Sequence, residues 1–228
     1  MMIERINDVQ LAQSREDREE AYRLRYSVYV RELGRALPGV DHGAQVITDD
    51  LDQSAALFIS RRAGDLAGTI RINLGTQQLP EHLRAQYGLD RFAAFDPRVF
   101  SFASRLVVRP ERRSSLVCLN LCKASYEYAR RNGVIFNFCH CEPRLIDFYL
   151  RLGYRAYRQA FTDPELGLRI PLALVLDDIA HLSAVRSPFL DLARQYQNCA
   201  GHSDWFHQTF PALHVPTEAI RLKGFLEQ

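Results

Sequence analysis

The sequence predicts an α+β domain, because segments with helical periodicity alternate with β-rich segments along the chain. Apolar residues at helical spacing mark two long helices, and continuous or alternating apolar runs of seven to ten residues mark the strands. The predicted order is helix, hairpin, helix, strand, helix, strand, helix, strand. Such an order is typical of a sheet that buries its faces against helices.

The first predicted helix begins at Ser14, whose hydroxyl can cap it with Asp17 three positions on, and runs to Gly34. Residues 35–54 follow. They hold proline, glycine and aspartates with little periodicity, so we expect a long loop. Loops of that length in a compact domain usually act as lids or binding segments.

Strand and helix signals continue from residue 55. Residues 55–62 and 66–74 are β-rich and joined by a short turn, which predicts a hairpin. A helix at 81–88 follows Pro80, and residues 99–108 predict a strand that runs directly into an arginine-rich turn.

That turn precedes a second long helix, expected from Ser114 or Ser115 to Asn132, with Gly133 at its C-terminal cap. The free N–H groups of a helix N-terminus bind phosphate readily. Arginine favours forked contacts with carboxylates and phosphates. The segment therefore predicts an anion-binding turn.

The last third predicts two more strands. Residues 134–141 are nearly all apolar, so this strand should be central and covered on both faces. A short helix at 142–154 has Pro143 in its first turn, and residues 169–176 form the final strand. We expect one domain at 1–180 and a C-terminal helical extension at 181–228 packed on it.

Composition excludes several classes of protein. The 228 residues are 47% hydrophobic and 25% charged, which fits neither a disordered chain nor a fibrous repeat. No apolar run approaches a membrane helix and the N-terminus lacks a signal-peptide core, so we expect a cytoplasmic protein without an integral membrane segment. A net charge of +2 is too small to indicate a nucleic-acid partner.

Five cysteines without a secretion signal argue against a disulfide framework. Cys118 with Cys122, and Cys139 with Cys141 around His140, could suggest a zinc site. Neither pair has the usual zinc-ligand spacing, and cysteine is often buried. We expect core packing and no metal.

Residues 15–180 resemble the GNAT acyltransferase superfamily. The resemblance is carried by LVVRPERRSSL at 106–116, by the strand at 134–141, and by Phe148-Tyr149 with Leu152-Gly153-Tyr154. It implies a central mixed, mostly antiparallel twisted sheet flanked by helices, with two strands splayed at the site of the pantetheine arm. The residues implied to bind the acyl donor are Leu106, Val107, Val108, Arg109, Arg112, Arg113, Ser114 and Ser115.

The family's loop is normally rich in glycine, whereas arginines and serines stand at 112–115. They leave less room for the pyrophosphate of coenzyme A. We therefore favour acyl carrier protein as the donor over acyl-coenzyme A, with Arg109, Arg112 and Arg113 meeting the carrier's acidic surface. No tightly bound cofactor is expected.

The first half of the chain looks like the acyl-homoserine-lactone (autoinducer) synthases and the long-chain N-acyl amino acid synthases. The matching positions are Arg25, Tyr29, Asp49, Asp52, Arg71, Ser104 and Arg105. Phe102 stands where autoinducer synthases have a glutamate, and Arg35 where a tryptophan usually follows the Leu-Gly pair. The acceptor implied is an amino acid or similar small amine. Asp49 and Asp52 would bind its ammonium or hold the arginines in a network.

The chemistry implied is acyl transfer from a thioester to an amine. Backbone N–H groups at Leu106 and Val107 would stabilise the oxyanion. Tyr149 would be the general acid unless it only packs on the sheet, and His140 the base unless it is a core residue. Glu142 could replace His140, or cap the next helix.

Three alternatives to a carrier-dependent N-acyltransferase stay open. They are an autoinducer synthase, an acetyl-coenzyme A-dependent acetyltransferase, and a non-catalytic module that binds an acyl carrier.

Overall fold

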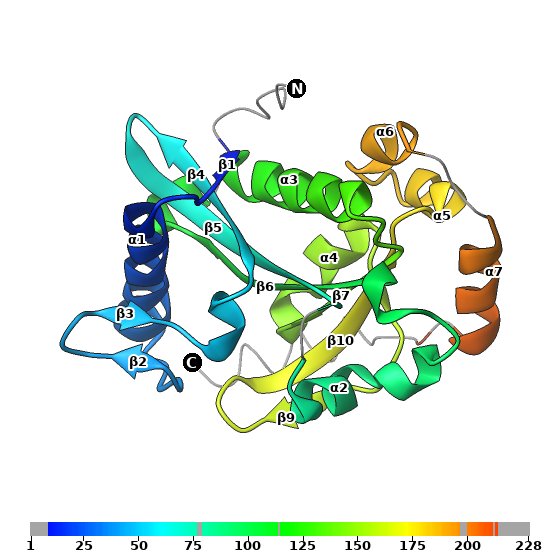
Figure 1. Cartoon of the computed structure of the whole chain (residues 1–228), viewed down its shortest axis with the longest axis horizontal. Helices are drawn as coiled ribbons and strands as arrows, with labels where there is room; N and C mark the ends of the chain where they lie inside the picture. The colour runs from blue at the N-terminus through cyan, green and yellow to red at the C-terminus, as the bar shows by residue number, and fades with distance from the viewer. Residues whose placement is uncertain (1–8, 77–78, 114, 197–199, 212, 214–228) are drawn as a thin grey trace. The chain divides into compact units, whose positions relative to one another are not determined.

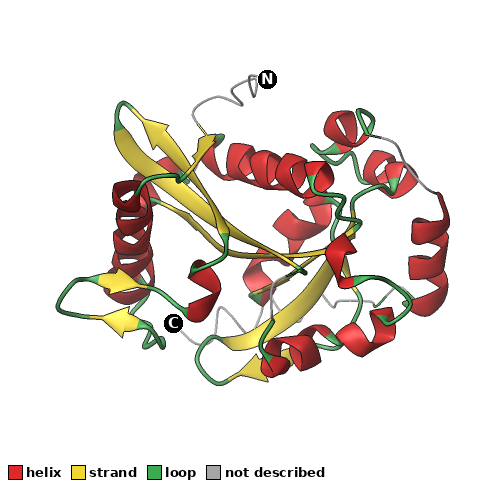
Figure 2. Ribbon diagram, in the orientation of Figure 1, coloured by secondary structure: helices red, strands yellow, loops and turns green. Residues whose placement is uncertain are grey.

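The computed structural model describes residues 9–76, 79–113, 115–196, 200–211 and 213. The chain divides into two units. Unit 1 comprises Met1–Gln77 with Phe102–Tyr128, and unit 2 comprises Gln78–Ser101 with Ala129–Gln228. The predicted α+β class is confirmed: the strands are mostly antiparallel and helices flank the sheet (Figure 2).

Unit 1 begins with strand β1 (Val9–Leu11) and helix α1 (Arg15–Tyr26). The predicted cap is confirmed, since the Asp17 N–H donates to Ser14 Oγ at 3.0 Å. The chain stays helical to Glu32, close to the predicted end at Gly34, but the helix changes type at residue 27. There the chain forms a π-helical segment, η1 (Ser27–Glu32).

The predicted hairpin is confirmed as β4 (Ala56–Arg62) and β5 (Asp65–Leu74), paired antiparallel with a register shift between Ser60 and Arg61. Strand β1 pairs antiparallel with β4. Strand β6 (Phe100–Val108) follows β5 in the sheet order, and its residues from Phe102 onward belong to unit 1. Helix α1 packs on this sheet through a core that includes Ala21, Leu24, Val28, Leu57 and Ile59 (Figure 1).

The sequence predicted a long loop at residues 35–54, but the structure contains regular elements there. These residues contain a small hairpin of β2 (Val40–Asp41) and β3 (Val46–Ile47), followed by a 3₁₀ turn, η2 (Asp50–Asp52). A Cβ on Gly39 would lie 1.8 Å from the Thr48 carbonyl oxygen, and Gly39 has a φ of +72°. Only glycine fits where these two strands come together.

After β6 the arginine-rich segment forms a 3₁₀ turn, η5 (Pro110–Arg112), and helix α3 (Val117–Arg131) follows. The helix begins two residues later than Ser115. The Ser115 hydroxyl accepts from the Val117 N–H at 3.3 Å and donates to the Arg112 carbonyl at 2.6 Å. Ser115 therefore joins the turn to the helix start, as a capping side chain does.

Unit 2 is built on β7 (Phe136–Cys141) and β10 (Gly167–Val175), which pair antiparallel from Phe136 with Val175 to Cys141 with Ile170. Strands β8 (Arg155–Ala156) and β9 (Phe161–Asp163) also pair with β10. The predicted burial of β7 is confirmed, because Phe136 and Phe138 expose 0% of their surface.

The helices of unit 2 begin with α2 (Glu81–Tyr87), and the 3₁₀ turns η3 (Leu89–Phe92) and η4 (Pro97–Val99) follow it. The predicted helix at 142–154 is a 3₁₀ turn, η6 (Pro143–Leu145), continued by α4 (Ile146–Leu152). Gly153 ends α4 in the left-handed conformation.

After β10 the described residues form α5 (Ile179–Ala184), α6 (Leu190–Ala193) and α7 (Ala200–Thr209). Phe206 of α7 and the following Phe210 are buried within an aromatic cluster. They lie 6.5 and 5.0 Å from the Phe92 ring centroid. This cluster packs α7 within unit 2.

Four of the five cysteines lie among the described residues, and they pack as expected for core residues. Cys122, Cys139 and Cys141 are buried and Cys118 is half-buried, all as free thiols. Burial raises the pKa of Cys141 to about 12. Within the described residues, no group of three or more His, Cys, Asp or Glu side chains is placed to hold a metal ion, and no helix is long and apolar enough to span a membrane.

Candidate active site

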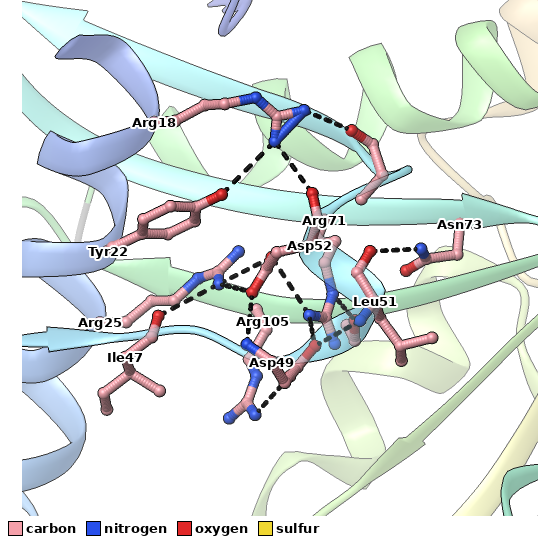
Figure 3. Close-up of polar contacts among 12 residues, drawn as sticks. Arg18, Tyr22, Arg25, Ile47, Asp49, Leu51, Asp52, Arg71, Asn73 and Arg105 are labelled. Atoms are coloured by element: carbon pink, nitrogen blue, oxygen red, sulfur yellow. Dashed lines mark hydrogen bonds and ion pairs between the residues drawn. The ribbon is translucent and has the colours of Figure 1, made fainter. Parts of the chain in front are cut away.

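The centre of unit 1 is a buried ion pair between α1 and the η2 turn. Arg25 exposes 0% of its surface, and its Nη1 donates to both carboxylate oxygens of Asp52, at 2.9 and 2.8 Å (Figure 3). Burial lowers the pKa of Arg25 and the neighbouring Asp52 opposes that shift. A pair this deeply buried fixes the position of the turn against the helix.

The spacing of Asp49 and Asp52 builds the turn itself. The Leu51 N–H donates to Asp49 Oδ1 at 3.1 Å, and the Asp49 N–H donates to Asp52 Oδ2 at 3.0 Å. Each carboxylate therefore satisfies backbone N–H groups at the start of η2, as in a capping box. The spacing of three residues between Asp49 and Asp52 therefore lets them cap the turn, in addition to forming ion pairs.

Strands β5 and β6 supply two further arginines. Arg71 Nη1 pairs with Asp49 Oδ1 and, at 3.1 Å, with Asp52 Oδ1, while Arg71 Nε donates to Ser104 Oγ at 2.9 Å. Arg105 Nη2 donates to Asp49 Oδ2 at 2.9 Å. The two aspartates thus connect three arginines from α1, β5 and β6, and we call these side chains with Ser104 the arginine–aspartate network.

Electrostatics keep Asp49 ionised. Burial would raise its pKa, but Arg71 and Arg105 outweigh that effect and lower the pKa to about 2. Burial likewise opposes ionisation of Arg105, whereas Tyr29 and Asp49 raise the pKa of this guanidinium. Arginines engage both carboxylates of the network, so the contacts of Asp49 and Asp52 give the network a structural role.

Arg105 has an unusual backbone for a strand residue, with a φ of +53°. The left-handed conformation costs a residue with a Cβ roughly 1–2 kcal/mol. The guanidinium of Arg105 lies 5.7 Å from the centroid of the Tyr29 ring, as does that of Arg35. Ring contact and ion pair together hold Arg105 in this conformation, immediately before Leu106.

Strand β6 carries the predicted acyl-donor residues. Leu106 is half-buried, while Val107 and Val108 are buried at 3% and 8% exposure. The Arg109 N–H donates to the Ala67 carbonyl of β5 at 2.9 Å. A Cβ on Gly68 would lie 2.9 Å from the Val107 carbonyl oxygen, so β5 approaches β6 as closely as glycine allows.

The three arginines predicted to meet a carrier protein differ in their contacts. Arg113 forms a bidentate pair with Glu32 at 2.6 and 2.7 Å, and Arg109 Nε donates to the Leu66 carbonyl. Arg112 is exposed, and its side chain has no hydrogen bond or ion pair to any residue that the structure describes. Ser114 lies outside the described residues.

The predicted acid and base candidates lie in unit 2. Tyr149, half-buried on α4, contacts Tyr154 edge-to-face at 5.5 Å between ring centroids. His140 on β7 stacks on Tyr87 at 6.1 Å. Glu142 pairs with Arg144 at 2.6 Å and with Arg169 at 3.5 Å, so two cations engage its carboxylate.

A family model described as N-acyl amino acid synthase FeeM matches residues 20–175. The chain belongs to this family. It is therefore an acyltransferase, and the predicted resemblance to this branch of the GNAT superfamily is confirmed. No curated protein matches the sequence.

Solved structures of low sequence identity share the fold of the FeeM family member described here. FeeM from uncultured soil microbes aligns with a TM-score of 0.63 and 18% identity, over 81% of this chain and 96% of that one. MesI, a CoA-dependent acyl-homoserine lactone synthase, aligns with a TM-score of 0.56 and 21% identity, over 79% and 87%. Escherichia coli ElaA aligns with a TM-score of 0.52 and 16% identity, over 73% and 97%.

Sequence reasoning missed three polar side chains around the network of this family member. Arg18 donates to the Asp52 carbonyl at 3.1 Å and to the Tyr22 hydroxyl at 3.4 Å, and Asn73 Nδ2 donates to the Leu51 carbonyl at 2.8 Å. A signal was present. Residues 18, 22, 25 and 29 share one helical face, and residues 71 and 73 share one face of β5.

Proposed function

We propose that this FeeM-family protein moves a long-chain acyl group from the phosphopantetheine thioester of acyl carrier protein to the amine of an amino acid or similar acceptor. The observation that carries the proposal is the hydrogen bond from Arg105 to Asp49 at 2.9 Å. It ties the η2 turn to β6 beside Leu106 and Val107, where we expect the thioester to lie.

In this proposal the acceptor nitrogen attacks the thioester carbonyl carbon, the C–S bond breaks and the thiol leaves. Backbone N–H groups at Leu106 and Val107 stabilise the oxyanion, and Tyr149 gives its proton to the departing thiolate. His140 takes the proton of the amine. Glu142 is the weaker base of the two candidates, because two arginines engage its carboxylate.

Two features support a carrier protein as the donor. Arg112 is exposed with no side-chain partner among the described residues, so it is available to an acidic partner surface. Arginines and serines also replace glycine at 112–115. The proposal places the protein in the cytoplasm, where acyl carrier protein is found, and treats residues 181–228 as an extension of the acyltransferase domain.

Product analysis tests the proposal. The purified protein is incubated with dodecanoyl and hexadecanoyl thioesters of acyl carrier protein or of coenzyme A, or with acetyl-coenzyme A. Each donor is combined with mixed amino acids or with S-adenosylmethionine, and products are read by mass spectrometry. We expect N-acyl amino acids from the carrier-protein thioesters.

Other products distinguish the alternatives. An acyl-homoserine lactone would identify an autoinducer synthase, although buried Phe102 stands at the position of that group's glutamate. N-acetyl products would identify an acetyltransferase. Absence of any product would favour a binding module and overturn the proposal.

A further inference from the structure

A pocket of about 640 Å³ opens in unit 1 between the start of α1, the β2–β3 hairpin and the η2 turn. This volume falls within the range of small-molecule sites. It touches the arginine–aspartate network only at the turn. Its lining residues are Arg18, Tyr22, Pro38, Gly39, Thr48, Asp49, Asp50, Asp52 and Gln53.

One wall of the pocket carries the guanidinium of Arg18, which contacts only neutral groups among the residues that the structure describes. Arg18 donates to the Asp52 carbonyl at 3.1 Å, the Ala55 carbonyl at 2.9 Å and the Tyr22 hydroxyl at 3.4 Å. All three acceptors are neutral, and Arg18 makes no ion pair with any described residue. A half-buried guanidinium that contacts only neutral groups favours a carboxylate, which it can bind with forked geometry.

The other wall carries negative charge. The Asp49 side chain is 28% exposed, whereas that of Asp52 is only 5% exposed. Asp50 is exposed, and no described residue pairs with its carboxylate. In Figure 3 Asp52 lies between Arg18 and Asp49, so the guanidinium and the accessible carboxylate flank the same turn.

We propose that this pocket binds the acceptor as an α-amino acid, with its carboxylate on Arg18 and its amino group on the Asp49 side. The amino group then faces the carboxylate that Arg105 holds, next to Leu106 on β6. The Tyr22 ring and Pro38 provide apolar surface for the side chain of the amino acid. The inference rests on the proposed function for its catalytic meaning, but the binding it predicts is measurable without catalysis.

Direct binding is the first test. L-tyrosine, L-phenylalanine and L-leucine are titrated into the protein by calorimetry without any acyl donor, next to tyramine, phenethylamine and isopentylamine. We expect at least one amino acid to bind roughly 10- to 100-fold more tightly than its decarboxylated amine, the range for a lost charge-assisted contact. Arg18→Gln should remove that difference.

Arg15→Gln is the matched control. Arg15 lies on the same helix and pairs with Glu19 at the surface, at 2.8 Å. The Arg15→Gln variant should bind the amino acids with the same affinity as the wild type. Because Arg18 also supports the turn, Arg18→Lys is measured as well, and it should restore part of the preference for the amino acid through its charge.

Kinetics separate recognition from structural support. If Arg18 binds the carboxylate, Arg18→Gln raises KM for the amino acid and leaves KM for the matching amine unchanged. Equal losses for both acceptors would show a structural role and overturn the inference. Wild-type protein that binds amino acid methyl esters as tightly as the free acids would also overturn it, whatever the stability of the variants.

The outcomes distinguish this inference from the proposed function. Amino acid binding that depends on Arg18, without acyl transfer from any donor, would support the amino acid site in the pocket and refute the proposed acyl transfer. Acyl transfer to amino acids, with Arg18→Gln changing KM equally for the amino acid and its amine, would support the proposed function. It would refute the assignment of the pocket as the amino acid site.

Discussion

Arg25 and Asp52 form an ion pair that is sealed from solvent, with Arg25 Nη1 at 2.9 and 2.8 Å from the two carboxylate oxygens and Arg25 exposing 0% of its surface. The pair joins the end of a helix to a turn 27 residues further along the chain. The other ion pairs of the arginine–aspartate network all involve Asp52 of that turn or Asp49, which caps it.

Asp52→Asn should destabilise unit 1 strongly, because it leaves the Arg25 guanidinium buried and uncompensated. Breaking one side of such a pair costs about 3–5 kcal/mol. Urea unfolding measures the loss. Arg23→Gln, which breaks an exposed pair with Glu19 on the same helix, should change the stability little. Similar effects of the two substitutions would contradict the burial of the pair.

Asp49 should make stability depend on pH in the acid range. Its folded pKa of about 2 lies below the ordinary value of 3.8 because Arg71 and Arg105 outweigh the effect of burial. Stabilisation is therefore complete above that ordinary value and is lost as the pH falls through about 2, amounting to about 2 kcal/mol. Urea unfolding at several pH values should show this slope in the wild type and in Asp50→Asn. Because the pKa of Asp96 is also about 2, part of the slope should remain in Asp49→Asn, and an undiminished slope in that variant would argue against the assignment.

Because Arg105 has a left-handed backbone, the Arg105→Gly variant should be more stable than the Arg105→Ala variant. Arg105→Gly and Arg105→Ala both lose the pair with Asp49, but only alanine keeps the strain of a φ of +53°. Arg105→Gly should therefore be more stable by roughly 1 kcal/mol. At Arg109, with a φ of −51°, the order should reverse. The same order at both sites would show that residue 105 is not strained.

Gly68→Ala should disturb the contact between β5 and β6. Its Cβ would lie 2.9 Å from both the Val107 carbonyl oxygen and Val117 Cγ1, so the strand or the helix must shift. Overpacking of this kind costs about 1–3 kcal/mol. Gly201→Ala, where nothing lies within 4 Å of the new atom, should be neutral or stabilising. Thermal unfolding compares the two, and an unchanged Tm in Gly68→Ala would refute the close approach.

Arg112→Glu should slow acyl transfer from acyl carrier protein more than transfer from a free pantetheine thioester, because charge reversal repels the acidic carrier. The loss of kcat/KM in the variant is measured for each donor, and the two losses are compared. Arg98→Glu, on an exposed turn of unit 2, is the control, and it should change kcat/KM equally for both donors. Equal losses for the two donors in Arg112→Glu would remove Arg112 from docking.

Local sequence signals predicted the elements that depend on local chemistry. Ser14 with Asp17 marked the cap of α1, and the apolar run at 134–141 marked a strand that is buried. The positions Arg25, Asp49, Asp52, Arg71 and Arg105 were expected to act together. The structure joins them, because each carries a charge that burial would otherwise penalise.

Features that depend on tertiary contacts could not be read from the sequence. Nothing in SVYVRE distinguishes a π-helix from an α-helix, and arginine at 105 gives no sign of a positive φ. The strand β8 has only two residues and gains its identity from its pairing with β10. The shared helical face of Arg18, Tyr22 and Arg25 was visible in the sequence, but the contacts of Arg18 with the Asp52 and Ala55 carbonyls depend on the tertiary fold.

The most direct test of the acyltransferase account is the fate of the acceptor nitrogen. The protein is given dodecanoyl acyl carrier protein with amino acids labelled with heavy nitrogen, and the acylated product is fragmented in the mass spectrometer. The account predicts an amide whose nitrogen carries the label and whose acyl chain comes from the carrier. An intact thioester with no labelled amide, under conditions where the protein is folded, would contradict it.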